Sequence, residues 1–104
     1  MDGNPGDYTV VEGGTFRSNV EYLCREIDIS YDNISTIIQV IKFAVLKNPD
    51  AHPVVPGHED KRFVFTRRVK RDNVYVPALR VLIKIHNAER RVELLALNST
   101  DVRL

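Results

Sequence analysis

The sequence feature that most constrains the fold is residues 79–86, where apolar and polar side chains alternate one by one. The odd positions are all β-branched or leucine: Leu79, Val81, Ile83 and Ile85. The even positions carry two cations and a histidine around one leucine: Arg80, Leu82, Lys84 and His86. A period of two is that of a β-strand. We therefore expect the odd face to cover a core and the even face to point to solvent or into a site.

Two similar segments flank this strand in the sequence, one at 62–69 and the other at 91–97. Three neighbouring strands of this kind predict an antiparallel meander with 79–86 in the middle. Residues 8–12 predict a further short strand at the edge of the sheet. Residues 1–7 are turn formers with nothing to bury, and we expect a loose N-terminal end there.

Two helices are predicted between the first strand and the meander. Ser18 and Glu21 have the spacing of a capping box, and the apolar positions that follow predict a helix over residues 18–27. Asp32 is the expected cap of the second helix. The apolar stripe of that helix is broad: Ile34, Ile37, Ile38, Ile41 and Val45. We expect this stripe to pack on the odd face of strand 79–86, because these are the two largest apolar surfaces of the chain.

The second helix should end at Asn48-Pro49, because the residue before a proline avoids the helical region. Residues 49–60 hold three prolines and a glycine and predict a loop. The order of elements is then β-α-α-β-β-β. This predicts one domain over residues 1–104 of the α+β class, with two N-terminal helices packed on one face of a mainly antiparallel sheet.

The composition excludes several kinds of site. Cys24 is the single cysteine, which rules out an internal disulfide, and its place on the apolar stripe of the first helix predicts a structural thiol. His52 and His58 lie near two acidic residues, but their spacing fits no standard zinc pattern, so no metal and no cofactor is predicted. The sequence has no apolar run of membrane-spanning length, and we expect a cytoplasmic protein.

The charge is distributed unevenly along the chain. Residues 1–60 contain four Lys and Arg against ten Asp and Glu, a formal charge of −6, whereas residues 61–104 contain eleven against four, a formal charge of +7. A basic half of this size suits an anionic partner such as nucleic acid or an acidic protein segment. The alternative is that the two sets of charges neutralise each other across the fold.

With this order of elements, the chain resembles the RelE/ParE toxin superfamily of bacterial toxin–antitoxin modules. The resemblance rests on the helix that ends in Leu46-Lys47-Asn48-Pro49, the Pro56-Gly57 loop, the central strand 79–85, the polar turn 87–90 and the closing strand 91–97. It implies a small antitoxin as partner, and either the ribosome with messenger RNA or DNA gyrase as target.

The resemblance also implies which residues would act. In relatives that cleave messenger RNA, an arginine on the sheet matches Arg80 and stabilises the charge of the transition state. His86, on the same face, is the candidate proton carrier. The candidate nucleic-acid ligands are all cationic: Arg67, Arg68, Lys70, Arg71 and Lys84. Tyr75 beside them could stack on a base.

The end of the chain departs from the family pattern. The ribonucleases of the family continue past the last strand with a glycine, a basic residue and a tyrosine or histidine, whereas this chain continues with residues 98–104, where Arg103 is the only cation. Two functions therefore stay open. The first is a toxin-like endoribonuclease that acts on RNA, and the second is a binding protein without chemistry, either a ParE-like gyrase inhibitor or a toxin relative that engages only its antitoxin.

Overall fold

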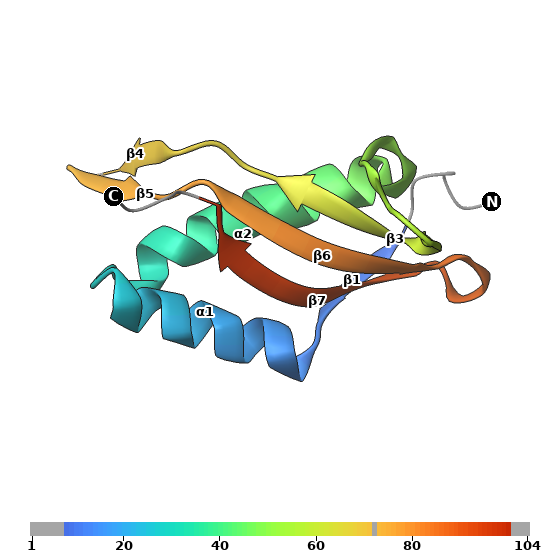
Figure 1. Ribbon diagram of the computed structural model, residues 1–104, viewed down its shortest axis with the longest axis horizontal. Coiled ribbons are helices and arrows are strands. Elements are labelled where there is room, and N and C mark those ends of the chain that lie inside the picture. Colours follow the sequence, from blue (N-terminus) through green and yellow to red (C-terminus); the bar gives the residue numbers. More distant parts are fainter. Residues whose placement is uncertain (1–7, 72, 101–104) are drawn as a thin grey trace.

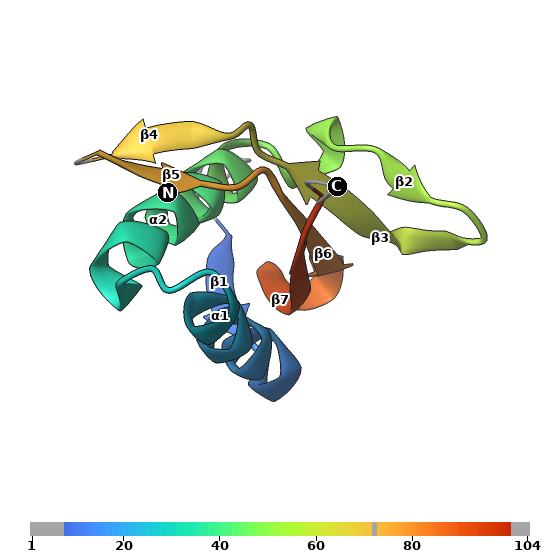
Figure 2. The same cartoon turned by 60° about the vertical axis from the view of Figure 1, so that its left-hand side comes forward.

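The computed structural model describes residues 8–71 and 73–100, with all of their side chains except that of Arg71. A first strand, β1 (Thr9–Glu12), is followed by two helices, α1 (Gly14–Glu26) and α2 (Tyr31–Lys47). The later strands are β2 (Val54–Val55), β3 (His58–Phe65), β4 (Val69–Arg71), β5 (Val74–Val76), β6 (Leu79–His86) and β7 (Arg91–Ser99). Both helices lie on one side of the sheet (Figures 1 and 2). The predicted α+β class is confirmed.

The main sheet has five strands in the order β1-β7-β6-β3-β2. Strand β6 is central and pairs antiparallel with both β3 and β7, so the predicted meander around residues 79–86 is confirmed. Strand β1 pairs with β7 in parallel, which makes the sheet mixed but mainly antiparallel. The position of β1 at the edge of the sheet is also as predicted.

The predicted element order is wrong in detail, because three short strands were not expected. Strand β2 lies inside the predicted loop 49–60 and pairs with β3 through a turn at Pro56-Gly57. Gly57 has a φ of 81°, the conformation that a glycine supplies at a turn after proline. The other two strands, β4 and β5, form a two-stranded ribbon beyond the end of the sheet where β6 begins (Figure 1).

Both helices begin at residues other than the predicted caps. Helix α1 starts at Gly14, four residues before Ser18, and the backbone N–H of Gly13 donates to the carbonyl of Leu94 at 2.9 Å. This start is set by a contact with β7, which is distant in sequence. The cap of α2 is Ser30, whose hydroxyl accepts from the backbone N–H of Asn33 at 3.3 Å.

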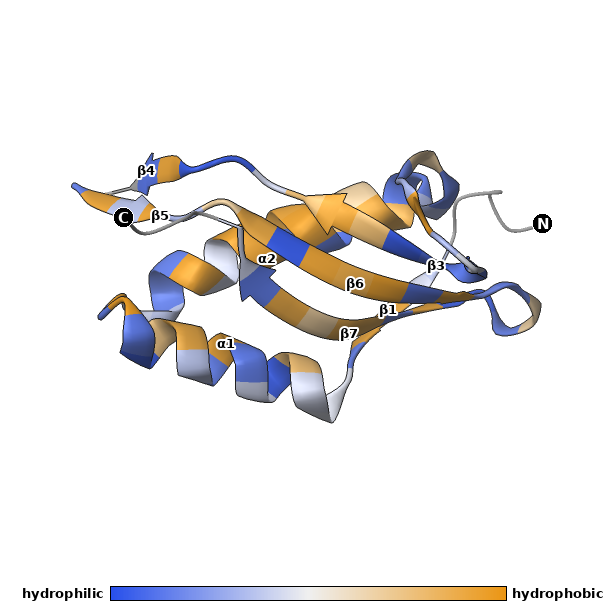
Figure 3. Cartoon of the chain, viewed as in Figure 1, coloured by the Kyte–Doolittle hydropathy of each residue, from blue (hydrophilic) through white to orange (hydrophobic). Residues whose placement is uncertain are grey.

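The core lies between the helices and the odd face of β6, as predicted. Leu79, Val81 and Ile83 are fully buried and belong to one apolar cluster with the stripe of α2. Ile85 is buried as well but is not part of that cluster. Figure 3 shows the alternation along β6 as bands of opposite hydropathy. The even residues are therefore on the side of the sheet away from the helices.

A register shift in β7 sets which of its residues join that outer side. Leu82 pairs with Ala96 whereas Ile83 pairs with Leu94, so Leu95 is an extra residue in the strand. Such a bulge turns the alternation of side chains by one position. It places Leu94 and Leu97, which are three residues apart, in the same core.

Candidate nucleic-acid interface

The side of the sheet away from the helices, which we call the open face, combines cations with aromatic side chains. Residues directly opposite each other on paired strands share a face. Lys61, Phe63 and Phe65 of β3 are opposite Lys84, Leu82 and Arg80 of β6. On the other side of β6, the open face continues with Arg91, Glu93, Ala96 and Asn98 of β7. No helix covers this side in the described part of the chain (Figure 2).

Arg80 lies between an aromatic ring and an amide. Its Cζ is 5.0 Å from the centroid of the Phe63 ring, and its Nε donates to Oδ1 of Asn98 at 3.4 Å. No carboxylate of the described residues forms an ion pair with it. The guanidinium is thus oriented by neutral partners and keeps its full charge for an anion.

Phe63 and Phe65 form an aromatic pair beside Arg80. Their ring centroids are 6.0 Å apart, with a tilt of 49° between the ring planes. Phe63 is half-buried next to Leu82, while 55% of Phe65 is exposed. An exposed phenylalanine on a sheet face contributes nothing to the core and offers a flat apolar surface to a planar ligand.

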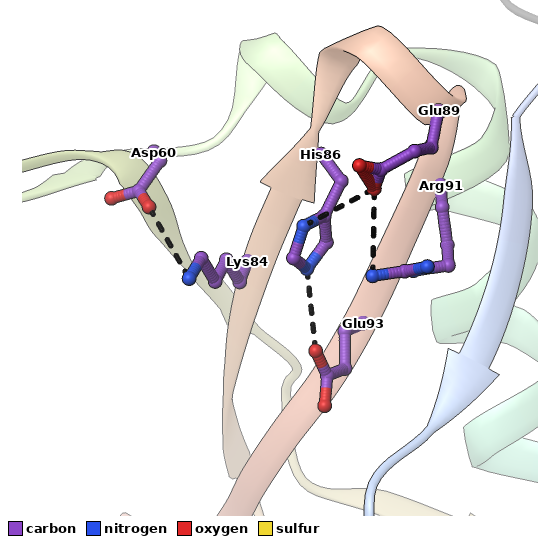
Figure 4. Close-up of polar contacts among 6 residues, drawn as sticks. All are labelled: Asp60, Lys84, His86, Glu89, Arg91 and Glu93. Atoms are coloured by element: carbon purple, nitrogen blue, oxygen red, sulfur yellow. Dashed lines mark hydrogen bonds and ion pairs between the residues drawn. The ribbon is translucent and has the colours of Figure 1, made fainter.

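Two lysines are directly opposite each other on the open face. Lys61 of β3 pairs in register with Lys84 of β6. Like charges in this position destabilise a sheet. The Nζ of Lys84 reaches one carboxylate, Oδ2 of Asp60, at 3.8 Å (Figure 4). Lys61 has no such partner among the described residues, so an anion bound between the lysines would relieve their repulsion.

His86 lies at the far end of β6 between two carboxylates (Figure 4). Its Nε2 is 3.3 Å from Oε1 of Glu93, and its Nδ1 is 3.6 Å from Oε2 of Glu89. The same Glu89 oxygen is 3.5 Å from Nη2 of Arg91. This end of the open face therefore carries carboxylates beside its cation, whereas no described carboxylate pairs with Arg80.

The structure does not bring the two candidate catalytic residues together. Arg80 and His86 are six residues apart on one extended strand, a separation of about 20 Å at roughly 3.3 Å per residue. Each side chain is held by different neighbours, Arg80 by Phe63 and Asn98, and His86 by Glu89 and Glu93. A single phosphate cannot touch both groups in this arrangement.

The cationic run at 67–71 continues from the Arg80 end of the open face. Phe65 is opposite Arg80, and Arg67 and Arg68 follow it in the exposed connection to β4. The Nζ of Lys70 is 5.6 Å from the ring centroid of Tyr75, which lies opposite it on β5. The side chain of Arg71 and the whole of Arg103 lie outside the described residues.

Cys24 and the possible metal ligands were the other candidates for a site. Burial raises the pKa of the Cys24 thiol, which packs against the core, so the thiol stays protonated as expected of a structural cysteine. Among the described residues, no group of His, Cys, Asp and Glu is arranged to hold a metal ion. In the same part of the chain, no helix is long and apolar enough to cross a membrane.

Sequence reasoning missed Lys61, Phe63, Phe65 and Asn98. The period of two along β3 was available and places the first three on one face. The strand register could not be read from the sequence. It is this register that places both Phe65 and Asn98 directly opposite Arg80. No protein-family model matches the chain, and a search of curated proteins finds no match either.

Proposed function

We propose that this domain is a toxin-like RNA-binding protein of the RelE/ParE kind, and that its open face holds single-stranded RNA. One observation carries the proposal: the Phe63–Phe65 pair lies beside Arg80, whose guanidinium pairs with no described carboxylate. Unstacked bases bind on aromatic side chains, and cations beside those side chains bind the phosphates. The proposed targets are messenger RNA and the ribosome, which imply a cytoplasmic protein.

The open face favours single strands over duplexes. In a duplex the bases stack on one another, so their flat surfaces are not available to Phe63 and Phe65. The cations of this face are distributed along two strands, Lys61 on β3 and Arg80 and Lys84 on β6. An extended backbone that follows β6 would meet Arg80 and Lys84 in turn, with its bases on Phe63 and Phe65, which lie opposite Leu82 and Arg80.

Rapid cleavage of RNA is not part of this proposal. An endoribonuclease of the RelE type needs a charge stabiliser and a proton carrier at the same phosphate. The separation of Arg80 from His86 argues against their joint action. Arg80 is proposed as a phosphate ligand, and the contacts of His86 with Glu89 and Glu93 favour a structural role for this histidine.

A direct test compares the affinity of the wild-type protein with that of the Phe63→Ala, Phe65→Ala double variant for a labelled single-stranded RNA. Loss of stacking costs about 1 to 3 kcal/mol per base, so the double variant should bind the RNA more weakly by about tenfold or more. Phe43→Ala is the matched control, because this phenylalanine is 70% exposed on α2, on the helical side. Equal losses in both variants, or none in either, would refute binding at the open face.

A second candidate is a non-catalytic protein that binds a small antitoxin along its helices. The observation behind it is an exposed apolar strip on α2, formed by Val40 and Phe43, which are 60% and 70% exposed. Phe43 also lines a groove of about 430 Å³ between α2 and β1, together with Tyr8, Val10 and Leu46. A groove of this kind suits the apolar face of an amphipathic segment.

This candidate is tested by the Phe43→Lys substitution in co-expression with the product of the neighbouring gene. Loss of co-purification in this variant, with retention in the Phe63→Ala, Phe65→Ala variant, would support an antitoxin bound along α2. Retention in the Phe43→Lys variant would exclude that surface. A supercoiling assay with purified DNA gyrase separates the ParE-like alternative from both.

A further inference from the structure

A second hollow begins where the open face ends. This groove of about 450 Å³ lies between α1 and the last residues of β7. Its floor is apolar and consists of Leu23, Ile27 and Leu97. The volume falls in the range of small-ligand sites, which is roughly 300 to 1,000 Å³.

The groove is continuous with the open face through Asn98. Asn98 lines the groove, and its Oδ1 accepts from the Arg80 guanidinium at 3.4 Å. Strand β1 pairs with β7 only as far as Leu94, and α1 runs along the remainder of β7 (Figure 1). An RNA strand bound at Phe65 and Arg80 that extends across β7 would therefore reach this groove.

Three side chains from one face of α1 form the helical wall of the groove. Asn19, Tyr22 and Glu26 are three and four residues apart, which aligns them along the helix. The Oδ1 of Asn19 accepts from the backbone N–H of Leu97 at 2.9 Å, so its amide NH₂ is oriented as a donor. The carboxylate of Glu26 has no partner among the described residues. The ring of Tyr22 lies between these two groups and is 59% exposed.

We infer that this groove reads one guanine base of the bound RNA, an inference that rests on the proposed RNA binding. A base stacked on Tyr22 would have the Asn19 amide at one end and the Glu26 carboxylate at the other. These residues are separated by about 10 Å along the helix axis. Guanine presents two adjacent N–H donors, at N1 and N2, to a carboxylate, and its O6 accepts from an amide.

The other bases match this set of groups less well. Uracil has no exocyclic amino group and offers the carboxylate a single N–H. Adenine and cytosine each have an amino group, but the ring nitrogen beside it is an acceptor, which a carboxylate repels. The groove therefore selects guanine through Glu26.

The experiment compares short oligouridylates that carry no guanine with those that carry a single guanine at either end. Because one well-placed base contact discriminates strongly between bases, guanine at one end should tighten binding about tenfold. Glu26→Gln should abolish this gain. Glu21→Gln is the matched control, because Glu21 is on the same helix but lines a different groove. Tyr22→Ala, with Tyr31→Ala as its control, should lose the gain in the same way.

The outcomes separate this inference from the proposal on which it rests. Binding of oligouridylate without any gain from guanine would overturn the guanine site and leave the open face in place. A larger gain from adenine or cytosine, or a gain that survives Glu26→Gln, would also overturn it. Failure of the wild-type protein to bind any single-stranded RNA would overturn both the guanine site and RNA binding at the open face.

Discussion

His52 shows how one residue can make the stability of the fold depend on pH. The side chain is half-buried, and its Nε2 has no hydrogen-bond partner among the described residues. Burial lowers the pKa of His52, as does the charge of Arg62, whereas a contact with the backbone of Ala44 acts in the opposite direction. The folded protein therefore favours the neutral imidazole.

We predict that stability falls on acidification because of this histidine. Below about pH 6.5 the imidazole of the unfolded chain takes up a proton that the folded protein resists, so the stabilisation present at higher pH is lost progressively. The decrease in Tm from about pH 7 to about pH 5 should be smaller for His52→Gln than for the wild-type protein. His58→Gln, an exposed histidine of β3, should leave the fall unchanged. Identical pH profiles for the wild-type and His52→Gln proteins would contradict this account.

Arg80 should contribute to RNA binding but not to the stability of the fold. Arg80→Ala should weaken the affinity for single-stranded RNA about tenfold, which corresponds to the loss of one charge-assisted contact of about 1.5 kcal/mol. Tm should change little, because the side chain is outside the core. Arg80→Lys should recover only part of the affinity, because an ammonium cannot donate two parallel hydrogen bonds while it stacks on Phe63. Full recovery by lysine would show that charge alone matters there.

At the scale of elements, β6 separates stability from function between its two faces. Ile83 is fully buried, so Ile83→Ala should lower the free energy of unfolding by about 2 to 5 kcal/mol. Leu82→Ala, one residue away on the open face, should cost less, because this leucine is only partly buried. Urea unfolding measures both. A larger loss at Leu82 than at Ile83 would mean that the faces are assigned backwards.

The elements that could be predicted are those with a periodic pattern of their own. Strand β6 and helix α2 were predicted because their apolar positions recur with periods of two and 3.6 residues. The start of α1 could not be predicted, because Gly13 is held by a bond to Leu94 on a distant strand. Strand β2 was hidden by prolines that lie at its ends. The bulge at Leu95 depends on the pairing of β7 with β6, which no local pattern encodes.

At the scale of the whole molecule, the acidic half of the chain neutralises some of the cations of the basic half. Arg62 and Lys84 of the basic half pair with Asp50 and Asp60 of the acidic half, at 3.3 and 3.8 Å. Arg80 pairs with no described carboxylate. The sequence could therefore predict a cationic strand face, but which cations stay available depends on tertiary neighbours.

Salt dependence reports how many cations meet phosphates. We predict that the RNA affinity falls steeply with added salt, because binding releases condensed counterions. Lys61→Gln should reduce the slope of log affinity against log salt by about 0.7, the value for one phosphate contact on a single strand. Arg62→Gln is the control on the neighbouring position, whose side chain points away from the open face to Asp50. A slope unaffected by Lys61→Gln would remove this lysine from the interface.

The most direct test of binding at the open face is a titration of the isotope-labelled protein with single-stranded RNA, followed residue by residue by NMR chemical shifts. The largest shifts should lie on the middle strands of the sheet, at Phe63, Phe65 and Arg80. The backbone of α2 around Val40 and Phe43 should stay unchanged. Shifts concentrated on α2, with none at Phe63 and Phe65, would rule out RNA binding at the open face.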